Sequence, residues 1–122
     1  MHEASLVRTL LEKVATLLRE HHGDSVDEVW IELGPLSGVE PLLVQSAFEQ
    51  LAPLHAMSTA KLMIREIPLE AKCRNCGDLF EIKHFRFRCQ SCESSDIQVI
   101  RGDEFRLLSI TIQQPVENEA SE

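Results

Sequence analysis

The sequence predicts an α+β fold in which two helices pack on one face of a three-stranded sheet. Three observations carry this prediction: two segments hold apolar residues at helical spacing, three alternate like strands, and four cysteines form a separate cluster before the last strand. The chain has 122 residues, of which 43% are hydrophobic, so it can build one small core. A chain of this size buries roughly two-thirds of its unfolded surface, and an additional cross-link would therefore help it to fold.

The first predicted helix covers residues 5–22. Its apolar residues form one stripe at helical spacing: Val7, Leu10, Leu11, Val14, Leu17 and Leu18. Ser5 is the expected N-cap, and Gly23 is the expected stop. His21 and His22 are not expected to bind a metal, because adjacent helical positions point about 100° apart and histidine is favoured near a helix C-terminus in any case.

The next elements are a strand and a second helix. Val29, Ile31 and Leu33 alternate with Trp30 and Glu32, which predicts a strand with one buried face. A turn over residues 34–38 follows, and Pro41 is expected to open a helix that ends before Pro53. The apolar face of that helix is predicted to comprise Leu43, Val44, Ala47, Phe48 and Leu51.

Two more strands complete the predicted sheet. Residues 60–67 are expected to form one, with Leu62 and Ile64 on the same side. Residues 105–112 are expected to form the last, and its predicted apolar face comprises Leu108, Ile110 and Ile112. Pro115 is expected to end that strand, and the acidic residues 116–122 are expected to fray.

The charge balance limits the classes of partner. Lys and Arg total 12 against 20 Asp and Glu, so the net charge is −8, which argues against non-specific binding to nucleic acid or to an anionic membrane. The chain shows neither an apolar run long enough to span a membrane nor the apolar core of a signal peptide. We therefore expect a cytoplasmic protein without a membrane partner.

Four cysteines follow the pattern C-x2-C-x12-C-x2-C: Cys73, Cys76, Cys89 and Cys92. In a reducing compartment such pairs hold a metal more often than they form disulfides. Four thiolates suit a closed, tetrahedral Zn(II) site, while redox dithiols and a mononuclear iron site are the alternatives. The spacer is expected to run as a strand, a turn and a returning strand, and Gly77 relieves crowding under the first pair. The sequence therefore predicts a structural zinc ribbon inserted into the α+β fold.

Zinc ribbons often bind nucleic acid, and this segment has mixed charges. Its basic residues Lys72, Arg74, Lys83, Arg86 and Arg88 are balanced by Glu70, Asp78, Glu81, Glu93 and Asp96. Residues 84–88 alternate basic and aromatic side chains, which favours a ribbon strand with Phe85 and Phe87 on one face. Contact of this stretch with RNA or DNA is the alternative.

The N-terminus is a second candidate metal site. Met1-His2-Glu3 places an imidazole and a carboxylate close to an amine. An α-amino group has a pKa of about 7.7–8.0, so it can lose its proton to a metal at modest cost. Amine, imidazole and amide nitrogens can wrap one ion in a planar set, which suits Ni(II) or Cu(II) better than Zn(II). The tripeptide alone does not establish such a site, because any chain that begins Met-His has some chelating ability.

Catalysis is not expected. No combination of nucleophile, base and acid stands out, and Ser37 has no evident histidine partner in the sequence. A zinc ion with four protein ligands also has no open position at which to activate water.

At this point the sequence resembles the HypA/HybF family, the nickel metallochaperones of [NiFe]-hydrogenase maturation. The motifs that carry the resemblance are Met1-His2-Glu3, Leu36-Ser37-Gly38-Val39-Glu40, Ala47-Phe48, the two cysteine pairs and Gly102 before the final strand. They cover the chain from its start to about residue 112. The second pair departs from many relatives, which have proline after its first cysteine and glycine or histidine after its second.

The resemblance implies a domain organisation and a set of ligands. Residues 1–68 and 101–122 would form a nickel-binding α/β domain, and residues 69–100 would form the zinc-ribbon insert. His2 would be the indispensable nickel ligand, with Met1 and Glu3 completing or tuning the site, while the four cysteines would bind zinc. Glu40 matches an acidic position near the nickel site, and the roles of His55 and His84 stay open.

The resemblance also implies a function and partners. The protein would bind Ni(II) at its N-terminus and deliver it to the precursor of the [NiFe]-hydrogenase large subunit, together with the GTPase HypB. Some relatives also serve urease, so urease maturation factors are further candidate partners. The alternative function is a zinc-ribbon adaptor for nucleic acid or protein, without a role for nickel.

Overall fold

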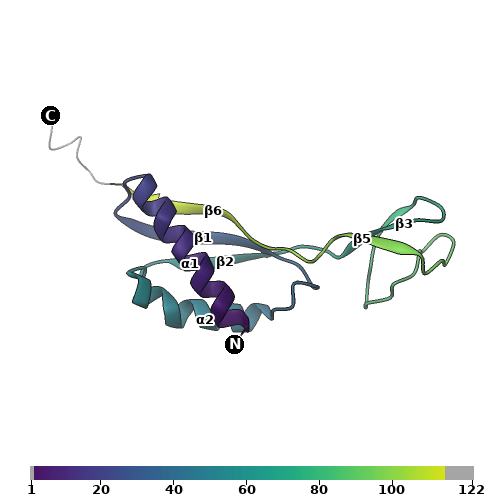
Figure 1. Ribbon diagram of the computed structural model, residues 1–122, viewed down its shortest axis with the longest axis horizontal. Coiled ribbons are helices and arrows are strands. Elements are labelled where there is room, and N and C mark those ends of the chain that lie inside the picture. Colours follow the sequence, from purple (N-terminus) through teal and green to yellow (C-terminus); the bar gives the residue numbers. More distant parts are fainter. Residues whose placement is uncertain (1, 115–122) are drawn as a thin grey trace. The chain divides into compact units, whose positions relative to one another are not determined.

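The computed structural model describes residues 2–114 and contains two helices, a short 3-10 helix and six strands (Figure 1). In chain order the elements are α1 (His2–Glu20), β1 (Ser25–Leu33), α2 (Pro41–Leu51), η1 (Ala52–His55), β2 (Lys61–Glu66), β3 (Glu70–Cys73), β4 (Leu79–Glu81), β5 (Ile97–Arg101) and β6 (Phe105–Gln113). The strands form two three-stranded sheets, with orders β2-β1-β6 and β4-β3-β5. The predicted α+β class is confirmed. Neither helix in this part of the chain combines the length and the apolar character that a membrane span requires.

The chain divides into two compact units. The helical unit comprises Met1–Ile31, Val39–Ile64 and Leu107–Glu122, and the cysteine unit comprises Glu32–Gly38 and Arg65–Arg106. Each unit therefore joins segments that are far apart in the sequence. The division of function between a nickel-binding domain and a zinc-ribbon insert stays a prediction.

The helical unit has a core between its helices and its strands. α1 packs against α2 and η1, and Figure 1 shows α1 lying across the sheet of β2, β1 and β6. The predicted stripe of α1 is confirmed, since four of its members are fully buried and two are half-buried: Val7, Leu10, Leu11 and Val14, then Leu17 and Leu18. Val44 and Phe48 of α2 are buried in the same unit.

α1 begins at His2, three residues before the predicted cap. Ser5 therefore lies inside the helix, where its carbonyl accepts a hydrogen bond from Thr9 Oγ1 at 3.2 Å, and its assignment as the N-cap is wrong. The physical reason is local: Ala4 is the best helix former, and the acidic Glu3 in the first turn interacts favourably with the helix dipole.

α1 ends at Glu20, two residues before the predicted end at residue 22. His22, rather than Gly23, adopts the left-handed conformation with φ 54°, and the Gly23 N–H donates to the Leu18 carbonyl at 3.0 Å. A Cβ atom on Gly23 would lie 2.6 Å from Leu18 Cδ1 and 2.9 Å from Ile112 Cδ1, so a larger residue here would have to displace the tips of these two side chains.

The helix α2 is only partly as predicted. It begins at Pro41, as expected, but Leu43 is 54% exposed, so its place on the buried face is wrong. Val44 and Phe48, four residues apart, set the buried direction, and Leu43 lies about 100° away from Val44 around the helix.

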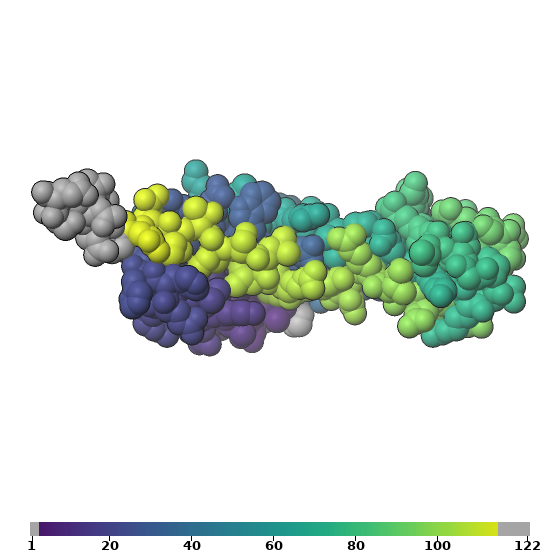
Figure 2. Space-filling model, turned by 90° about the horizontal axis from the view of Figure 1, so that it is seen from above, coloured from purple at the N-terminus to yellow at the C-terminus, as the bar shows by residue number. Residues whose placement is uncertain are grey.

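The three strands predicted for the sheet β2-β1-β6 are confirmed, with small shifts of their ends. Val29, Ile31 and Leu33 of β1 are buried, and Leu62 of β2 is buried as well. In β6, Ile110 and Ile112 are half-buried, whereas Leu108 is 38% exposed. β6 is an edge strand, and Figure 2 shows its residues (yellow) at the surface. Pro115 and the tail predicted to fray lie outside the described residues.

The sheet of the cysteine unit is built around β3. β3 pairs antiparallel with β4 on one side and with β5 on the other. The core of this unit is small and consists of Leu69, Ala71, Cys73, Phe80, Ile82 and Cys89, with Ile97 packed against it.

The returning strand predicted within the spacer is absent from this part of the structure. Residues 84–88 form an irregular loop after β4, in which His84 and Phe85 both have φ 55°. Two successive left-handed residues interrupt the alternation of a strand, so the prediction that Phe85 and Phe87 share one strand face is wrong. Both rings are exposed, by 60% and 40%.

Glu32 is a buried carboxylate that the strand pattern placed on the outer face. It is only 4% exposed, and its Oε1 accepts hydrogen bonds from Arg106 at 2.8 Å (Nη2) and 3.0 Å (Nε). Arg101 lies 3.9 Å from the other carboxylate oxygen and 4.0 Å from Glu70. A buried charge is tolerated when it is paired and hydrogen-bonded, and these two arginines, distant in sequence, supply the pairing.

Two backbone segments of the cysteine unit approach each other at Gly34 and Gly102. The Leu36 N–H donates to the Gly102 carbonyl at 2.7 Å, and the Gly34 N–H donates to the Glu104 carbonyl at 2.9 Å. A Cβ atom on Gly34 would lie 2.1 Å from the Gly102 oxygen. Because the obstacle is backbone, no side-chain rotation can relieve the overlap.

Gly34→Ala is therefore expected to lower the free energy of unfolding of the cysteine unit by about 3 kcal/mol. Gly77→Ala is the matched control, because Gly77 has φ 80° but no atom within 4 Å of its Cβ position, so only backbone strain of about 1 kcal/mol applies. Denaturant titrations followed by the amide NMR signals of residues 65–106 measure both. Equal losses for the two variants would contradict the close approach at Gly34.

Candidate metal centre

The four cysteines converge on one point in the cysteine unit. Their Sγ atoms all lie within 4.8 Å of one another, and Sγ–Sγ distances of 3.6 Å join Cys73 to Cys92 and Cys76 to Cys89. All four are free thiols in the structure. Sulfurs about 2.3 Å from a tetrahedral zinc ion lie about 3.8 Å apart, so the spacing fits such an ion.

The two cysteine pairs adopt the same local structure. The N–H of Cys73 donates to the Asp78 carbonyl at 2.8 Å, and the N–H of Cys89 donates to the Ser94 carbonyl at 2.9 Å. In each pair the N–H of the second cysteine points at the first sulfur, at 3.4 Å for Cys76 and 3.5 Å for Cys92. These donors stabilise negative charge on the sulfur.

Both turns end in a left-handed residue directly after the second cysteine. Gly77 has φ 80° and Glu93 has φ 63°, and their N–H groups donate to the carbonyls of Cys73 and Cys89 at 2.9 and 3.0 Å. The departure from the family pattern at Glu93 therefore leaves the turn intact, although a non-glycine residue in this region costs about 1–2 kcal/mol.

The sulfurs differ in how readily they ionise. The Asn75 side-chain amide, 3.5 Å from the Cys92 sulfur, and the Ser94 backbone lower the pKa of Cys92 to about 6. For Cys76 the Asp78 backbone lowers the pKa, but the hydrogen bond with Cys89, desolvation and the other two sulfurs together raise the pKa to about 12. The neighbouring sulfurs thus favour the thiolate at Cys92 and disfavour it at Cys76, and a divalent cation among them would favour the thiolate at every ligand.

The donor set fits a structural metal. Four sulfur ligands from two rigid turns leave no open position for a substrate, and Cys73 and Cys89 are buried while Cys76 and Cys92 are exposed. Among the side chains that the structure describes, those of residues 3–114, no other group of three or more His, Cys, Asp or Glu residues is arranged to hold a metal ion.

The structure places only part of the predicted N-terminal site. Met1 and the side chain of His2 lie outside the described residues, while the backbone of His2 is the first residue of α1. Glu3 follows in the first turn and is half-buried. The first four N–H groups of an α-helix have no acceptor within the helix, and those of His2 and Glu3 are among them.

Glu40, His55 and His84 belong to different elements. Glu40 is exposed and precedes α2, where its carbonyl accepts the Val44 N–H at 2.9 Å. His55 Nδ1 lies 3.1 Å from the Leu51 carbonyl at the end of η1. His84 belongs to the cysteine unit, in the loop after β4.

Sequence reasoning missed the polar residues that support the sulfurs. Asn75 contacts the Cys92 sulfur, and the Ser91 hydroxyl donates to Asp78 Oδ2 at 2.8 Å, which joins the two turns. The position of Asn75 and Ser91 between paired cysteines could have indicated this role, because polar residues there commonly donate a hydrogen bond to sulfur or to the neighbouring turn.

Fold and site together define a small α+β protein with a closed four-cysteine metal centre. Residues 1–112 match the model of a family described as "Hydrogenase/urease nickel incorporation, metallochaperone, hypA". The chain belongs to this HypA family.

Individual relatives support the assignment over nearly the whole chain. The hydrogenase maturation factor HypA of Aquifex aeolicus is 34% identical over 113 residues, which are 93% of this chain and 98% of that protein. HypA of Helicobacter hepaticus is 33% identical over 116 residues, and the match covers 92% of this chain and 97% of that protein. A solution structure of a HypA protein matches with a TM-score of 0.72 at 26% identity, covering 94% and 98% of the two chains.

Loss of one cysteine is expected to remove the metal and to unfold the cysteine unit. In Cys73→Ser the purified protein should lose its single equivalent of metal, and the amide signals of residues 65–106 should collapse, because structural zinc contributes about 10–16 kcal/mol to the folding of small zinc modules. Elemental analysis and NMR measure the two effects.

Ser91→Ala is the control, since Ser91 lies between two ligands but supplies none. It should retain one equivalent of metal. A full equivalent in Cys73→Ser would show that the four-sulfur centre is not the metal site.

Glu93→Gly is expected to stabilise the cysteine unit by about 1 kcal/mol, because glycine adopts φ 63° without strain but loses more entropy on folding. Gln90→Gly, in the same turn, is the control and should destabilise the unit slightly. Denaturant midpoints at a fixed metal concentration measure both. A loss of stability in Glu93→Gly would show that the backbone of Glu93 is not strained.

Proposed function

We propose that this protein is a nickel carrier that binds Ni(II) at Met1, His2 and Glu3 and delivers it to the precursor of the [NiFe]-hydrogenase large subunit. A zinc ion on Cys73, Cys76, Cys89 and Cys92 would maintain the cysteine unit. The protein would act without catalysis, in the cytoplasm, and with the GTPase HypB as a partner. Urease maturation factors are further candidate partners, in keeping with the family description.

The observation that carries this proposal is the start of α1 at His2, in a chain of the HypA family. Because the N–H groups of His2 and Glu3 lie in the first turn, they have no helical acceptor. A metal can therefore take these amide nitrogens as ligands without breaking a hydrogen bond of the helix. In the interior of a helix the same ligands would each break one.

The nitrogen-rich set accounts for the choice of metal. Ni(II) and Cu(II) accept planar nitrogen ligands, whereas Zn(II) prefers a tetrahedron and would gain less from amide nitrogens. The four-sulfur centre has the opposite preference, since soft thiolates in a tetrahedron suit zinc. The two sites would thus sort two metals by geometry.

The helix dipole opposes a cation at this position, and Glu3 offsets the opposition. The N-terminal end of a helix carries about half a positive charge, which repels a divalent ion. The Glu3 carboxylate in the first turn supplies negative charge there, and metal binding to amide nitrogens removes their protons. Lower pH returns those protons, so nickel release would be favoured by acid.

His2→Ala is expected to weaken Ni(II) binding by at least about 100-fold, because even the loss of a group that only orients a metal ligand costs 10–100-fold. Zinc content and fold should stay unchanged. Calorimetric titration of the untagged protein measures the affinity, and the absorption band of planar Ni(II) reports the geometry.

His21→Ala is the matched control, since His21 is exposed at the other end of the same helix. It should bind nickel like the unmodified protein. A variant with two extra residues before Met1 moves the amine and should lose the planar spectrum. Unchanged Ni(II) affinity in His2→Ala would overturn the proposed site and favour an adaptor function.

A further inference from the structure

The loop at residues 83–88 displays a concentrated set of cationic and aromatic side chains. Its six residues are Lys83, His84, Phe85, Arg86, Phe87 and Arg88, with no acidic residue among them, in a chain of net charge −8. All six are exposed. We call this segment the cationic loop.

The backbone of the cationic loop holds its side chains outward. His84 and Phe85 both have φ 55°, a backbone conformation that residues other than glycine rarely adopt. The rings of Phe85 and Phe87 lie with centroids 6.4 Å apart at 42°, so they support each other outside the core. Strain of this kind persists where the surrounding structure fixes it and often marks a functional surface.

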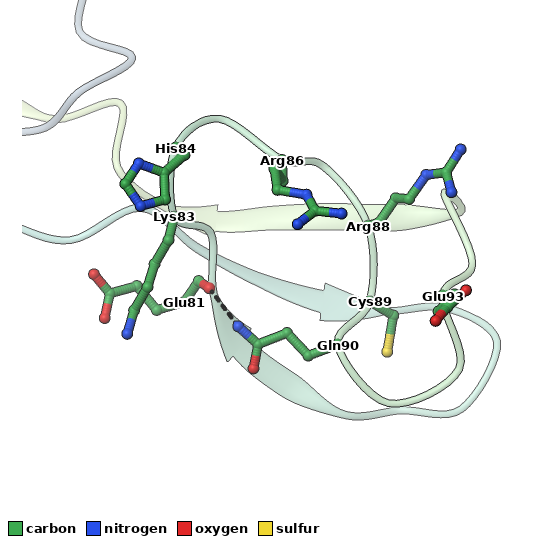
Figure 3. A pocket seen from close by; sticks show the side chains of 8 residues that line it. All are labelled: Glu81, Lys83, His84, Arg86, Arg88, Cys89, Gln90 and Glu93. Carbon is green, nitrogen blue, oxygen red and sulfur yellow. Dashed lines mark hydrogen bonds between the residues drawn. The ribbon is translucent and has the colours of Figure 1, made fainter.

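A polar cavity lies on one side of the cationic loop. It has a volume of about 380 Å³ and is lined by Lys83, His84, Arg86 and Arg88, together with Glu81 and Glu93 (Figure 3). Gln90 closes part of its wall by donating to the Glu81 carbonyl at 3.4 Å. Among the side chains that the structure describes, Lys83, Arg86 and Arg88 form no salt bridge, since the ion pairs there involve Arg74, Arg101 and Arg106.

An apolar cavity shares two residues of the cationic loop with the polar one. It has a volume of about 450 Å³, and Ile67, Pro68, Leu69 and Phe85 line it along with Pro35. Lys83, His84 and Glu81 line both cavities. An occupant of the apolar cavity would therefore lie beside the Lys83 ammonium, with the Glu81 carboxylate also at the shared wall.

We propose that the cationic loop and its two cavities are a docking site for an acidic segment of a partner protein. The segment would place one large apolar side chain against Phe85 and Pro68, and its carboxylates near Lys83, Arg86 and Arg88. This pairing of a buried anchor with charges at the rim is how small interfaces obtain both affinity and specificity. The inference concerns the cysteine unit alone and does not rest on the nickel site.

A peptide fits this surface better than a nucleic acid does. Glu81 and Glu93 stand in the polar cavity, and a strand with a phosphate at every nucleotide could not avoid both. The two rings are inclined at 42°, so they do not offer parallel faces to successive bases. A peptide can place its carboxylates selectively, opposite the arginines.

The test is selection of a random displayed-peptide library on the full, zinc-loaded chain. We expect enriched peptides that combine acidic residues with one aromatic or large aliphatic residue. The double variant Arg86→Glu/Arg88→Glu should weaken the best peptide at least about tenfold, because like charges then face each other. Phe85→Ser should also weaken it, and Arg86→Lys/Arg88→Lys should retain most of the binding.

Two controls in the same unit separate this site from general effects. Lys72→Glu changes an exposed charge on β3, and Leu79→Ser changes a side chain of β4 that is 64% exposed. Both should bind the peptide like the unmodified chain, and zinc analysis should confirm that every variant is folded.

Several outcomes would overturn the proposal. The first is that no peptides are enriched, or only neutral or basic ones. The second is that the loop variants bind the best peptide as tightly as the unmodified chain does. The third is that the two control variants lose as much peptide affinity as the loop variants do. Single-stranded oligo-dT that binds more tightly than the best peptide, and through Arg86 and Arg88, would assign the surface to nucleic acid instead.

Discussion

The convergence of four sulfur atoms is the constraint on which the cysteine unit depends. The apolar cluster around β3 has six buried members, and two of them, Cys73 and Cys89, carry sulfurs of the candidate metal centre. So few apolar contacts offset little of the conformational entropy of the segment from β3 to β5, which runs from Glu70 to Arg101. An ion that neutralised the thiolates would therefore supply stability that hydrophobic burial alone does not.

The same constraint separates two kinds of metal binding. A site with four protein ligands on two hydrogen-bonded turns has no vacant position, so an ion bound there leaves only when the turns open. A carrier needs the reverse property, namely ligands that can be removed one at a time. The first turn of α1 has that property, since its N–H groups serve no helical bond. A metal ion that stabilises the fold and a metal ion that is passed on would therefore bind at different places on the chain.

Sequence patterns predicted what local chemistry determines. The spacing of Cys73, Cys76, Cys89 and Cys92 was sufficient to predict that the four sulfurs converge, because the geometry of each pair depends on residues within its own turn. The buried stripe of α1 was predicted for the same reason. Glu32 could not be placed, because its burial depends on Arg106, which lies 74 positions further along the chain. Ser5 was misassigned because a good cap residue was given more weight than the helix-forming residues before it.

Residues 84–88 were predicted to form a strand but form a loop, and the physical cause of this difference also explains why their side chains are exposed. Alternation predicts a strand only while successive residues stay extended, and two left-handed residues, His84 and Phe85, reverse the chain instead. The reversal lets Cys89 return to Cys76, at a sulfur separation of 3.6 Å, without a second full strand. The same turn leaves Phe87 and the neighbouring cations with no sheet to cover them. Because the reversal also brings the sulfurs together, the exposed loop and the candidate metal centre are parts of one local structure.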